Sequence, residues 1–245
     1  MAEQPYAIQM RGVTKTFGSV TANKDVDLNL RQGEILALLG ENGSGKTTLM
    51  NMLSGIYKPD RGDILVEGKP VSIDSPQDAK RLGIGMVHQH FKLVDVFSAA
   101  DNIWMGQEKT GLLLGRSRFS RVEEMAKRFG FDLDPRKKVA NMAVSEKQTL
   151  EIVKVLCYGA KVIILDEPTA VLTVQEIEKL FGVLRRMKEE GHSIIIITHK
   201  LNEVMEISDR VAILRKGEYI TTVDTAATNE QELTEYMVGR KVDLN

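Results

Sequence analysis

A glycine-rich stretch, residues 40–48 (GENGSGKTT), combines three glycines with a lysine and two threonines. Glycines let successive backbone N–H groups curl around phosphate oxygens, because no Cβ obstructs the approach. The pattern G-x-x-x-x-G-K-[ST] is typical of loops that bind nucleotide phosphates. Lys46 is then predicted to reach the β- and γ-phosphates, and the Thr47 hydroxyl to bind Mg²⁺. The predicted nucleotide contacts are Gly40, Asn42, Gly43, Ser44, Gly45, Lys46, Thr47 and Thr48. A glycine-rich turn without a ligand is the alternative.

Two carboxylates, Asp166 and Glu167, directly follow the aliphatic run 162–165. An acidic residue at the end of a buried strand beside a phosphate loop holds Mg²⁺, and Asp166 is the candidate for that role. Glu167 would then orient or deprotonate an attacking water. A solvated acidic turn before Pro168 is the alternative. His199 ends another apolar run and could reach a γ-phosphate, but a histidine at a strand end is more often structural.

The elements that must position these groups alternate between apolar strands and helical patterns, which favours an α/β fold with a mostly parallel sheet. Strands are predicted over 34–40, 84–89, 161–168 and 193–199, and hairpins over 62–71 and 210–222. Helices are predicted over 46–55, 173–191 and 229–239, and Thr173 with Glu176 forms a capping box for the second of them.

The middle of the chain, residues 91–157, differs from the rest in its predicted secondary structure. It has no strong strand pattern, a Gly/Leu loop at 110–115 and one amphipathic helix over 121–130. We interpret it as a helical lobe inserted into a core made of residues 1–90 and 158–245. The whole chain is then one domain of two intimate lobes.

The composition is that of a globular protein, with 42% hydrophobic and 27% charged residues among 245. Lys+Arg 33 against Asp+Glu 34 gives a formal charge of -1, so we expect no nucleic-acid partner. The apolar runs are too short to span a membrane, and the start has no signal-peptide pattern. The single cysteine, Cys157, suits a reducing compartment and is expected to be a buried, inert thiol. These features predict a soluble cytoplasmic chain.

These motifs, in this order, resemble the ATP-binding cassette of ABC transporters over nearly the whole chain. The resemblance implies a RecA-like P-loop NTPase core with an antiparallel β lobe and an inserted helical lobe, binding ATP and Mg²⁺. In this family a glutamine after the strand 84–89, here Gln89, ligates Mg²⁺ and senses the membrane partner. His199 matches the family's switch histidine, which acts beside Glu167 and Lys46. Phe17 matches the aromatic residue that stacks on adenine, with a core phenylalanine as the alternative.

Within the family, DEPTAVLT, ITHKLNEV and YMVGR look most like importers of simple sugars and nucleosides, and MVHQHFKLV leans towards nucleosides. The resemblance implies an ATPase that lies peripherally on the cytoplasmic side of the cell membrane and drives solute import through a permease. The expected coupling groove surrounds Gln89, Phe91, Leu93 and Phe97, although these side chains could equally be core. Such importers usually fuse two cassettes, so we expect this chain to be an N-terminal half.

The family's signature, L-S-G-G-Q, ends 20 positions before the Mg²⁺ aspartate. Counting back from Asp166 places Met142, Ala143, Val144, Ser145 and Glu146 at those positions. Ala143 lacks the hydroxyl that the family's serine donates to a γ-phosphate, Ser145 adds a Cβ where glycine lets the backbone approach, and Glu146 brings negative charge.

The altered signature has two interpretations, one structural and one functional. Ser145 with Gln148 is predicted to be a capping box that retains the helix start. In the family, each signature completes the phosphate site of a partner cassette. We therefore expect the altered signature to weaken the partner's site and to leave this chain's own site intact.

Two other classes of protein compete with the transporter ATPase. Soluble ABC proteins that act on ribosomes or DNA tend to carry basic linkers or long coiled-coil insertions, and this sequence shows neither. A small-molecule kinase with a P-loop does not explain Gln89, the DEPTAVLT segment and His199 together.

Overall fold

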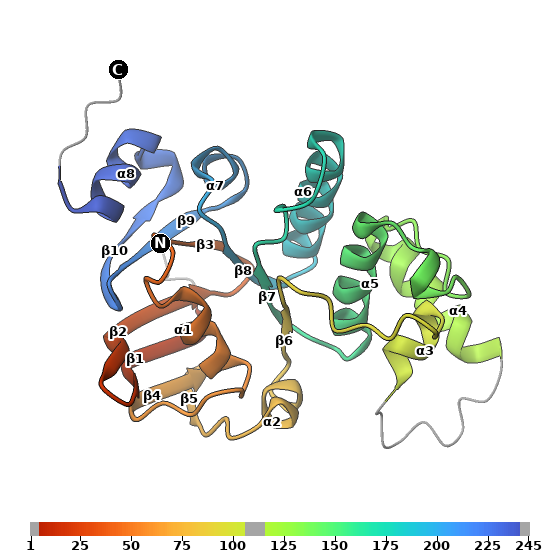
Figure 1. Ribbon diagram of the computed structural model, residues 1–245, viewed down its shortest axis with the longest axis horizontal. Helices are drawn as coiled ribbons and strands as arrows, with labels where there is room; N and C mark the ends of the chain where they lie inside the picture. The colour runs from red at the N-terminus through yellow and green to blue at the C-terminus, as the bar shows by residue number, and fades with distance from the viewer. Residues whose placement is uncertain (1–4, 106–115, 241–245) are drawn as a thin grey trace.

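Two β-sheets organise the computed structural model, which describes residues 5–105 and 116–240 (Figure 1). The six-stranded sheet has the order β10-β9-β3-β8-β7-β6. Its strands are β3 (Ile35–Leu39), β6 (Ile84–Val87), β7 (Val162–Asp166), β8 (Ser193–Ile197), β9 (Arg210–Arg215) and β10 (Glu218–Asp224). Neighbours pair in parallel except β9 and β10, which form an antiparallel hairpin. The predicted parallel core is confirmed, and its central strands are uniformly apolar because both faces are covered.

The smaller, antiparallel sheet has the order β2-β1-β4-β5. Its strands are β1 (Tyr6–Phe17), β2 (Val20–Arg31), β4 (Arg61–Val66) and β5 (Lys69–Val71). The helix α1 (Lys46–Leu53) contributes its apolar face to a core cluster that also takes side chains from both sheets. The two sheets therefore share one hydrophobic core, and α1 is held firmly at the point where the glycine-rich loop ends.

Seven further α-helices complete the described residues. They are α2 (Pro76–Arg81), α3 (Ala99–Trp104), α4 (Arg116–Phe129), α5 (Val144–Cys157), α6 (Val174–Glu189), α7 (Leu201–Ile207) and α8 (Glu230–Val238), with short 3₁₀ turns η1 (Val139–Asn141) and η2 (Thr225–Ala227). The sequence analysis missed α2, α3 and α7, and it began α4 too late, at residue 121. The Gly/Leu loop predicted at 110–115 lies outside the described residues.

The helices α3, α4 and α5 lie together at one end of the molecule, away from the smaller sheet (Figure 1). The helix α5 packs on both sides: Leu150 and Val153 join the cluster of α3 and α4, whereas Ile152 and Leu156 join the cluster under β7 and α6. The division of the chain at residue 157 stays a prediction, since α5 is shared. Cys157 in this helix is half-buried rather than buried as predicted, and burial raises the pKa of its thiol to about 11, which agrees with an inert thiol.

In the part of the chain that the structure describes, none of the helices has both the length and the apolar character that a membrane crossing requires.

A buried ion pair joins the two sheets. Glu34, 3% exposed, lies between β2 and β3, and the Arg210 guanidinium at the start of β9 donates to its Oε2 at 2.9 Å. The same guanidinium donates to the Asn29 carbonyl at 2.9 Å, and the Arg31 N–H donates to Glu34 at 2.6 Å. Removing one partner would leave the other charge buried and uncompensated.

We predict that Arg210→Met lowers the free energy of unfolding by about 3–5 kcal/mol, because Glu34 is left buried without its cation. The double variant Glu34→Leu/Arg210→Met should lose less free energy of unfolding than Arg210→Met, because no unpaired charge is left in the core. Lys24→Met is the control, since Lys24 and Glu218 form an exposed pair at 3.0 Å and exposed pairs contribute little to stability. Urea unfolding measures all three, and equal losses for Arg210→Met and Lys24→Met would contradict the prediction.

Candidate functional site

A cleft of about 730 Å³ opens at the carboxyl ends of the central strands. It is lined by residues of the glycine-rich loop and by groups that follow β6, β7 and β8. Parallel strands bring these ends to one edge of a sheet, where ligands bind in open α/β folds. The predicted residues that line it are Asn42, Gly43, Ser44, Gly45, Lys46, Thr47, Thr48, Gln89, Asp166, Glu167 and His199.

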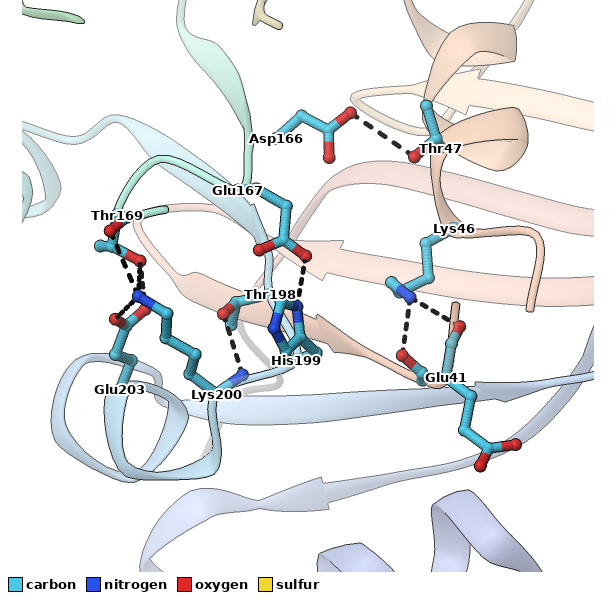
Figure 2. Close-up of polar contacts among 11 residues, drawn as sticks. Glu41, Lys46, Thr47, Asp166, Glu167, Thr169, Thr198, His199, Lys200 and Glu203 are labelled. Atoms are coloured by element: carbon cyan, nitrogen blue, oxygen red, sulfur yellow. Dashed lines mark hydrogen bonds and ion pairs between the residues drawn. The ribbon is translucent and has the colours of Figure 1, made fainter. Parts of the chain in front are cut away.

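The loop between β3 and α1 has the backbone that phosphate binding requires. Gly45 has φ 94, and a Cβ there would lie 2.4 Å from the Ala22 carbonyl. The Lys46 ammonium donates to the carbonyls of Gly40 and Glu41, at 2.6 and 2.9 Å, so it lies over the loop (Figure 2). Gly40 itself lies beneath the loop rather than in the cleft lining. The loop can thus offer N–H groups, a helix N-terminus and a cation to a phosphate chain.

Residues that the sequence analysis missed hold this loop from outside. The Asn23 side chain, fully buried on β2, donates to the Gly45 carbonyl at 3.2 Å. The Gly217 N–H, in the β9–β10 turn, donates to the Ser44 carbonyl at 3.1 Å. Both partners are remote in sequence from the loop, so no local pattern could have indicated them.

Oxygen ligands suited to Mg²⁺ meet beside the loop. The Thr47 hydroxyl donates to Asp166 Oδ2 at 3.5 Å, which joins the start of α1 to the end of β7 (Figure 2). Within the described residues, Glu167 Oε2 is buried and has no hydrogen-bond partner. A buried carboxylate oxygen without a donor is costly unless a cation or a water satisfies it. The hydroxyl and carboxylate oxygens present therefore fit a hard divalent cation.

The buried charges of the cleft shift each other's pKa. Burial raises the pKa of Asp166, and the charge of Glu167 raises it further, against the Thr47 hydrogen bond and the Lys46 charge. Burial also lowers the pKa of Lys46, while Glu167 and Asp166 oppose that shift. The free cleft is electrostatically strained, because it keeps like charges close together in a desolvated place.

Glu167 and His199 form a contact pair. His199 Nδ1 lies 2.9 Å from Glu167 Oε1, and the Glu167 N–H donates to the Ile197 carbonyl at 3.0 Å (Figure 2). Glu167 has φ 49, a backbone conformation that a non-glycine residue adopts at a cost. A carboxylate held by a histidine beside a phosphate loop has the arrangement of an oriented general base.

The model of the ABC transporter family matches residues 23–170, more than half of the chain. The chain belongs to the ABC transporter family. It is 48% identical over 239 residues to the nucleoside import ATP-binding protein NupA of Lactococcus lactis subsp. cremoris (strain MG1363), covering 97% of this chain and 47% of NupA. It is 49% identical to the guanosine import ATP-binding protein NupO of Bacillus subtilis (strain 168), with 98% of this chain and 47% of NupO covered. The chain spans about half the length of these curated relatives.

Solved ABC cassettes share the fold. The dimeric post-hydrolysis structure of the cassette MJ0796, bound to ADP and Pi, matches with a TM-score of 0.77 and 25% identity, over 89% of this chain and 98% of that one. The predicted P-loop NTPase fold of an ABC cassette is confirmed.

Phe17 lies outside the residues that line the cleft of this ABC cassette. It is 42% exposed at the end of β1, with its ring edge-on to Tyr57 at 5.0 Å and the Lys15 ammonium 5.5 Å from its centroid. The side chain is therefore not a core residue. Adenine stacking stays a prediction, and an exposed ring braced by a second aromatic is compatible with it.

The segment predicted to be the altered ABC signature lies at the start of α5, and the predicted capping box of Ser145 and Gln148 is wrong. The N-cap is Ala143, and the Glu146 carboxylate reaches back to accept the Ala143 N–H at 2.8 Å. The Lys137 ammonium donates to both Glu146 oxygens, at 2.7 and 2.8 Å. Val144 and Ser145 therefore occupy the first turn, and the charge of Glu146 is matched by Lys137.

We predict that Asp166→Asn stabilises the cassette at pH 7 when Mg²⁺ and nucleotide are absent. Asp166 titrates near pH 3.9 in the unfolded chain, and its pKa is raised in the folded one. Its contribution to stability is therefore full below the unfolded pKa and is lost as the pH rises through the folded pKa. Asparagine does not suffer that loss, so its melting temperature should be higher, by about 2–4 °C per kcal/mol.

The advantage of Asp166→Asn should disappear below about pH 4, where the aspartate is neutral in both states. With MgATP the unmodified chain should have the higher melting temperature of the two, because the Asp166 carboxylate then gains its cation. Melting curves at pH 4 and 7, with and without MgATP, check both signs, and a lower melting temperature of the free variant at pH 7 would contradict the account.

Proposed function

We propose that this chain is an ATP-hydrolysing cassette that powers nucleoside import through a membrane permease, with simple sugars as the alternative solute. The observation that carries the proposal is the contact of Glu167 with His199 in the cleft that also holds Lys46 and Asp166. The printed functions of NupA and NupO favour a nucleoside over a sugar.

The chemistry that the cleft supports is attack of water on a γ-phosphate. Glu167 takes the proton of the water or orients it, and His199 holds the Glu167 carboxylate. Lys46 and the loop N–H groups stabilise the charge on the phosphate oxygens. Thr47, Gln89 and Asp166 would hold Mg²⁺, which neutralises charge on the phosphates when it is bound. Gln89 is exposed in the cleft lining, so it is accessible for this role.

The first partner that we propose is a second cassette, fused after this one in the full-length protein. The double length of the curated relatives supports a second half, and the dimeric MJ0796 structure supports pairing. In a head-to-tail pair, Ala143 and Ser145 would face the partner's nucleotide. The machinery built on Lys46 and Glu167 would face the partner's signature.

The second proposed partner is a permease, which would hold the chain peripherally on the cytoplasmic side of the membrane. A groove of about 390 Å³ lies between β6, α2 and α5, next to the segment that follows Gln89. In the segment that follows Gln89, Phe97 is 39% exposed, whereas Leu93 packs on the helical cluster. Of the residues expected to couple, Phe97 thus supports a docking surface and Leu93 supports the core.

Glu167→Gln tests the proposed chemistry. We expect the variant to keep its affinity for MgATP and to lose at least about 100-fold in hydrolysis by the assembled transporter, because a positioned base is worth that much. Steady-state ATPase activity and nucleotide binding measure the two effects separately. Normal turnover would assign catalysis to the other composite site.

Repair of the signature tests the proposed pairing. A homodimer of this chain presents Ala143 and Ser145 to both phosphate sites, so it should hydrolyse ATP poorly. A hydrogen bond to a charged group contributes roughly 1.5–3 kcal/mol, which corresponds to about 10- to 150-fold in rate if it acts in the transition state. Ala143→Ser/Ser145→Gly should therefore raise the ATPase rate at fixed protein concentration, with little change in nucleotide affinity.

Lys46→Ala in the repaired chain is the control and should abolish the gain. Brisk hydrolysis by the unmodified chain, or no response to the repair, would overturn the pairing scheme.

A further inference from the structure

A closed polar cluster lies beside the catalytic pair without touching the cleft. It consists of Thr169, Lys200 and Glu203, from the segment after β7, the segment after β8 and the first turn of α7 (Figure 2). None of the three is among the residues that line the nucleotide cleft. Their chemistry is therefore not used by the proposed hydrolysis directly.

The contacts within this cluster satisfy every side-chain donor that it contains. The Lys200 ammonium donates to Glu203 Oε1 at 2.9 Å, to the Thr169 carbonyl at 3.2 Å and to the Thr169 hydroxyl at 3.2 Å. The Thr169 hydroxyl donates to Glu203 Oε2 at 2.6 Å. Three ammonium protons thus meet three acceptors, and each carboxylate oxygen receives one donor.

The place of the cluster in the chain links it to Glu167 and His199. Thr169 follows Glu167 by two positions, and Lys200 directly follows His199. The Ala170 N–H donates to the Glu167 carbonyl at 3.2 Å, so Thr169 lies inside a tight turn that starts at Glu167. The cluster therefore joins the two segments that carry the contacting catalytic side chains.

Stability alone is a weak reason for such a cluster. Thr169 is 1% and Glu203 4% exposed, whereas the Lys200 side chain is 33% exposed, and desolvation of the Glu203 carboxylate offsets part of the attraction within the pair. A half-buried pair of this kind is better suited to fixing geometry than to adding stability, because all of its contacts form in one arrangement only. The charges of Lys200 and Glu203 cancel, so the pair can fix the geometry without adding net charge next to the phosphates.

We propose that Thr169, Lys200 and Glu203 are positioning residues that hold Glu167 and His199 in contact. The catalytic part of this inference rests on the proposed ATP hydrolysis, whereas the geometric part concerns the free chain. Loss of the cluster lets the two segments separate, and the Glu167 carboxylate loses its fixed direction. A misplacement of about 1 Å at a reacting group can cost about 100-fold in rate.

The first test compares Thr169→Val, which keeps the shape of the side chain, with Thr169→Ser, which keeps the hydroxyl. In the assembled transporter, Thr169→Val should lower kcat by about 10- to 100-fold with an unchanged KM for ATP, whereas Thr169→Ser should retain most of the kcat. Thr225→Val is the matched control: Thr225 is 5% exposed, and its hydroxyl lies 2.8 Å from that of Ser208, remote from the cleft. It should lower the melting temperature similarly and leave kcat unchanged.

The second test needs no activity. The chain has four histidines, so substitution assigns the side-chain nitrogen resonances of His199. In the full free chain, Thr169→Val should move the Nδ1 signal towards its position in Glu167→Ala, whereas the signal of His192 stays in place. Lys200→Met should act in the same way, which guards against a variant that fails to fold.

The outcomes separate the two proposals. An unmoved His199 signal together with an unchanged kcat in Thr169→Val overturns the positioning role, and equal kcat losses in Thr169→Val and Thr225→Val do so as well. A moved signal in the free chain, together with an assembled transporter that has no ATPase activity, supports the positioning role and contradicts the proposed hydrolysis.

Discussion

The parallel pairing of β7 with β8 is the constraint on which the site depends. Asp166 lies opposite Ile197 in this register, and the next N–H, that of Glu167, donates to the Ile197 carbonyl at 3.0 Å. A slip of one residue would turn each side chain of β7 to the other face of the sheet and remove Asp166 from Thr47. The all-apolar strands make such a slip costly, because both faces are packed against helices or the smaller sheet. The register thus fixes the carboxylates before any ligand binds.

The cleft that this register creates is costly to the free protein. Burial raises the pKa of Asp166, Glu167 has a strained backbone, and one of the Glu167 oxygens is buried without a donor among the described residues. Strain of this kind persists only where the surrounding structure over-determines it. The surroundings here are the paired strands and the α1 helix packed between two sheets. The stability of the core therefore offsets the unfavourable interactions in the cleft. The cleft groups are placed to contact a cation and phosphates, not to stabilise one another.

The sequence predicted the local parts of the site and missed its long-range supports, and it also missed the short helices α2, α3 and α7. Short stretches of sequence determine the phosphate loop, the strand-end carboxylates and the two predicted hairpins, so spacing alone predicted their positions. Asn23 and Gly217 support the loop from remote strands, and the cluster of Thr169, Lys200 and Glu203 forms only when two segments meet. The start of α5 was misjudged for a different reason. Ser145 is a good cap in isolation, but the pairing of Glu146 with Lys137 and with the Ala143 N–H begins the helix earlier.

The contacts at the start of α5 also show that the three changes in the predicted signature, at Ala143, Ser145 and Glu146, have different consequences. The charge of Glu146 is directed back to its own helix and matched by Lys137, so it does not by itself repel an anion at the N-terminus of α5. The first N–H groups of the helix remain available, as in any helix of this length. What the chain has lost is the hydroxyl at Ala143 and the open approach at Ser145. In the proposed pair of cassettes, the composite site that receives this helix start would therefore keep the backbone contacts of α5 but have no hydroxyl at Ala143, so it should hydrolyse ATP more slowly than it would with a serine at this position.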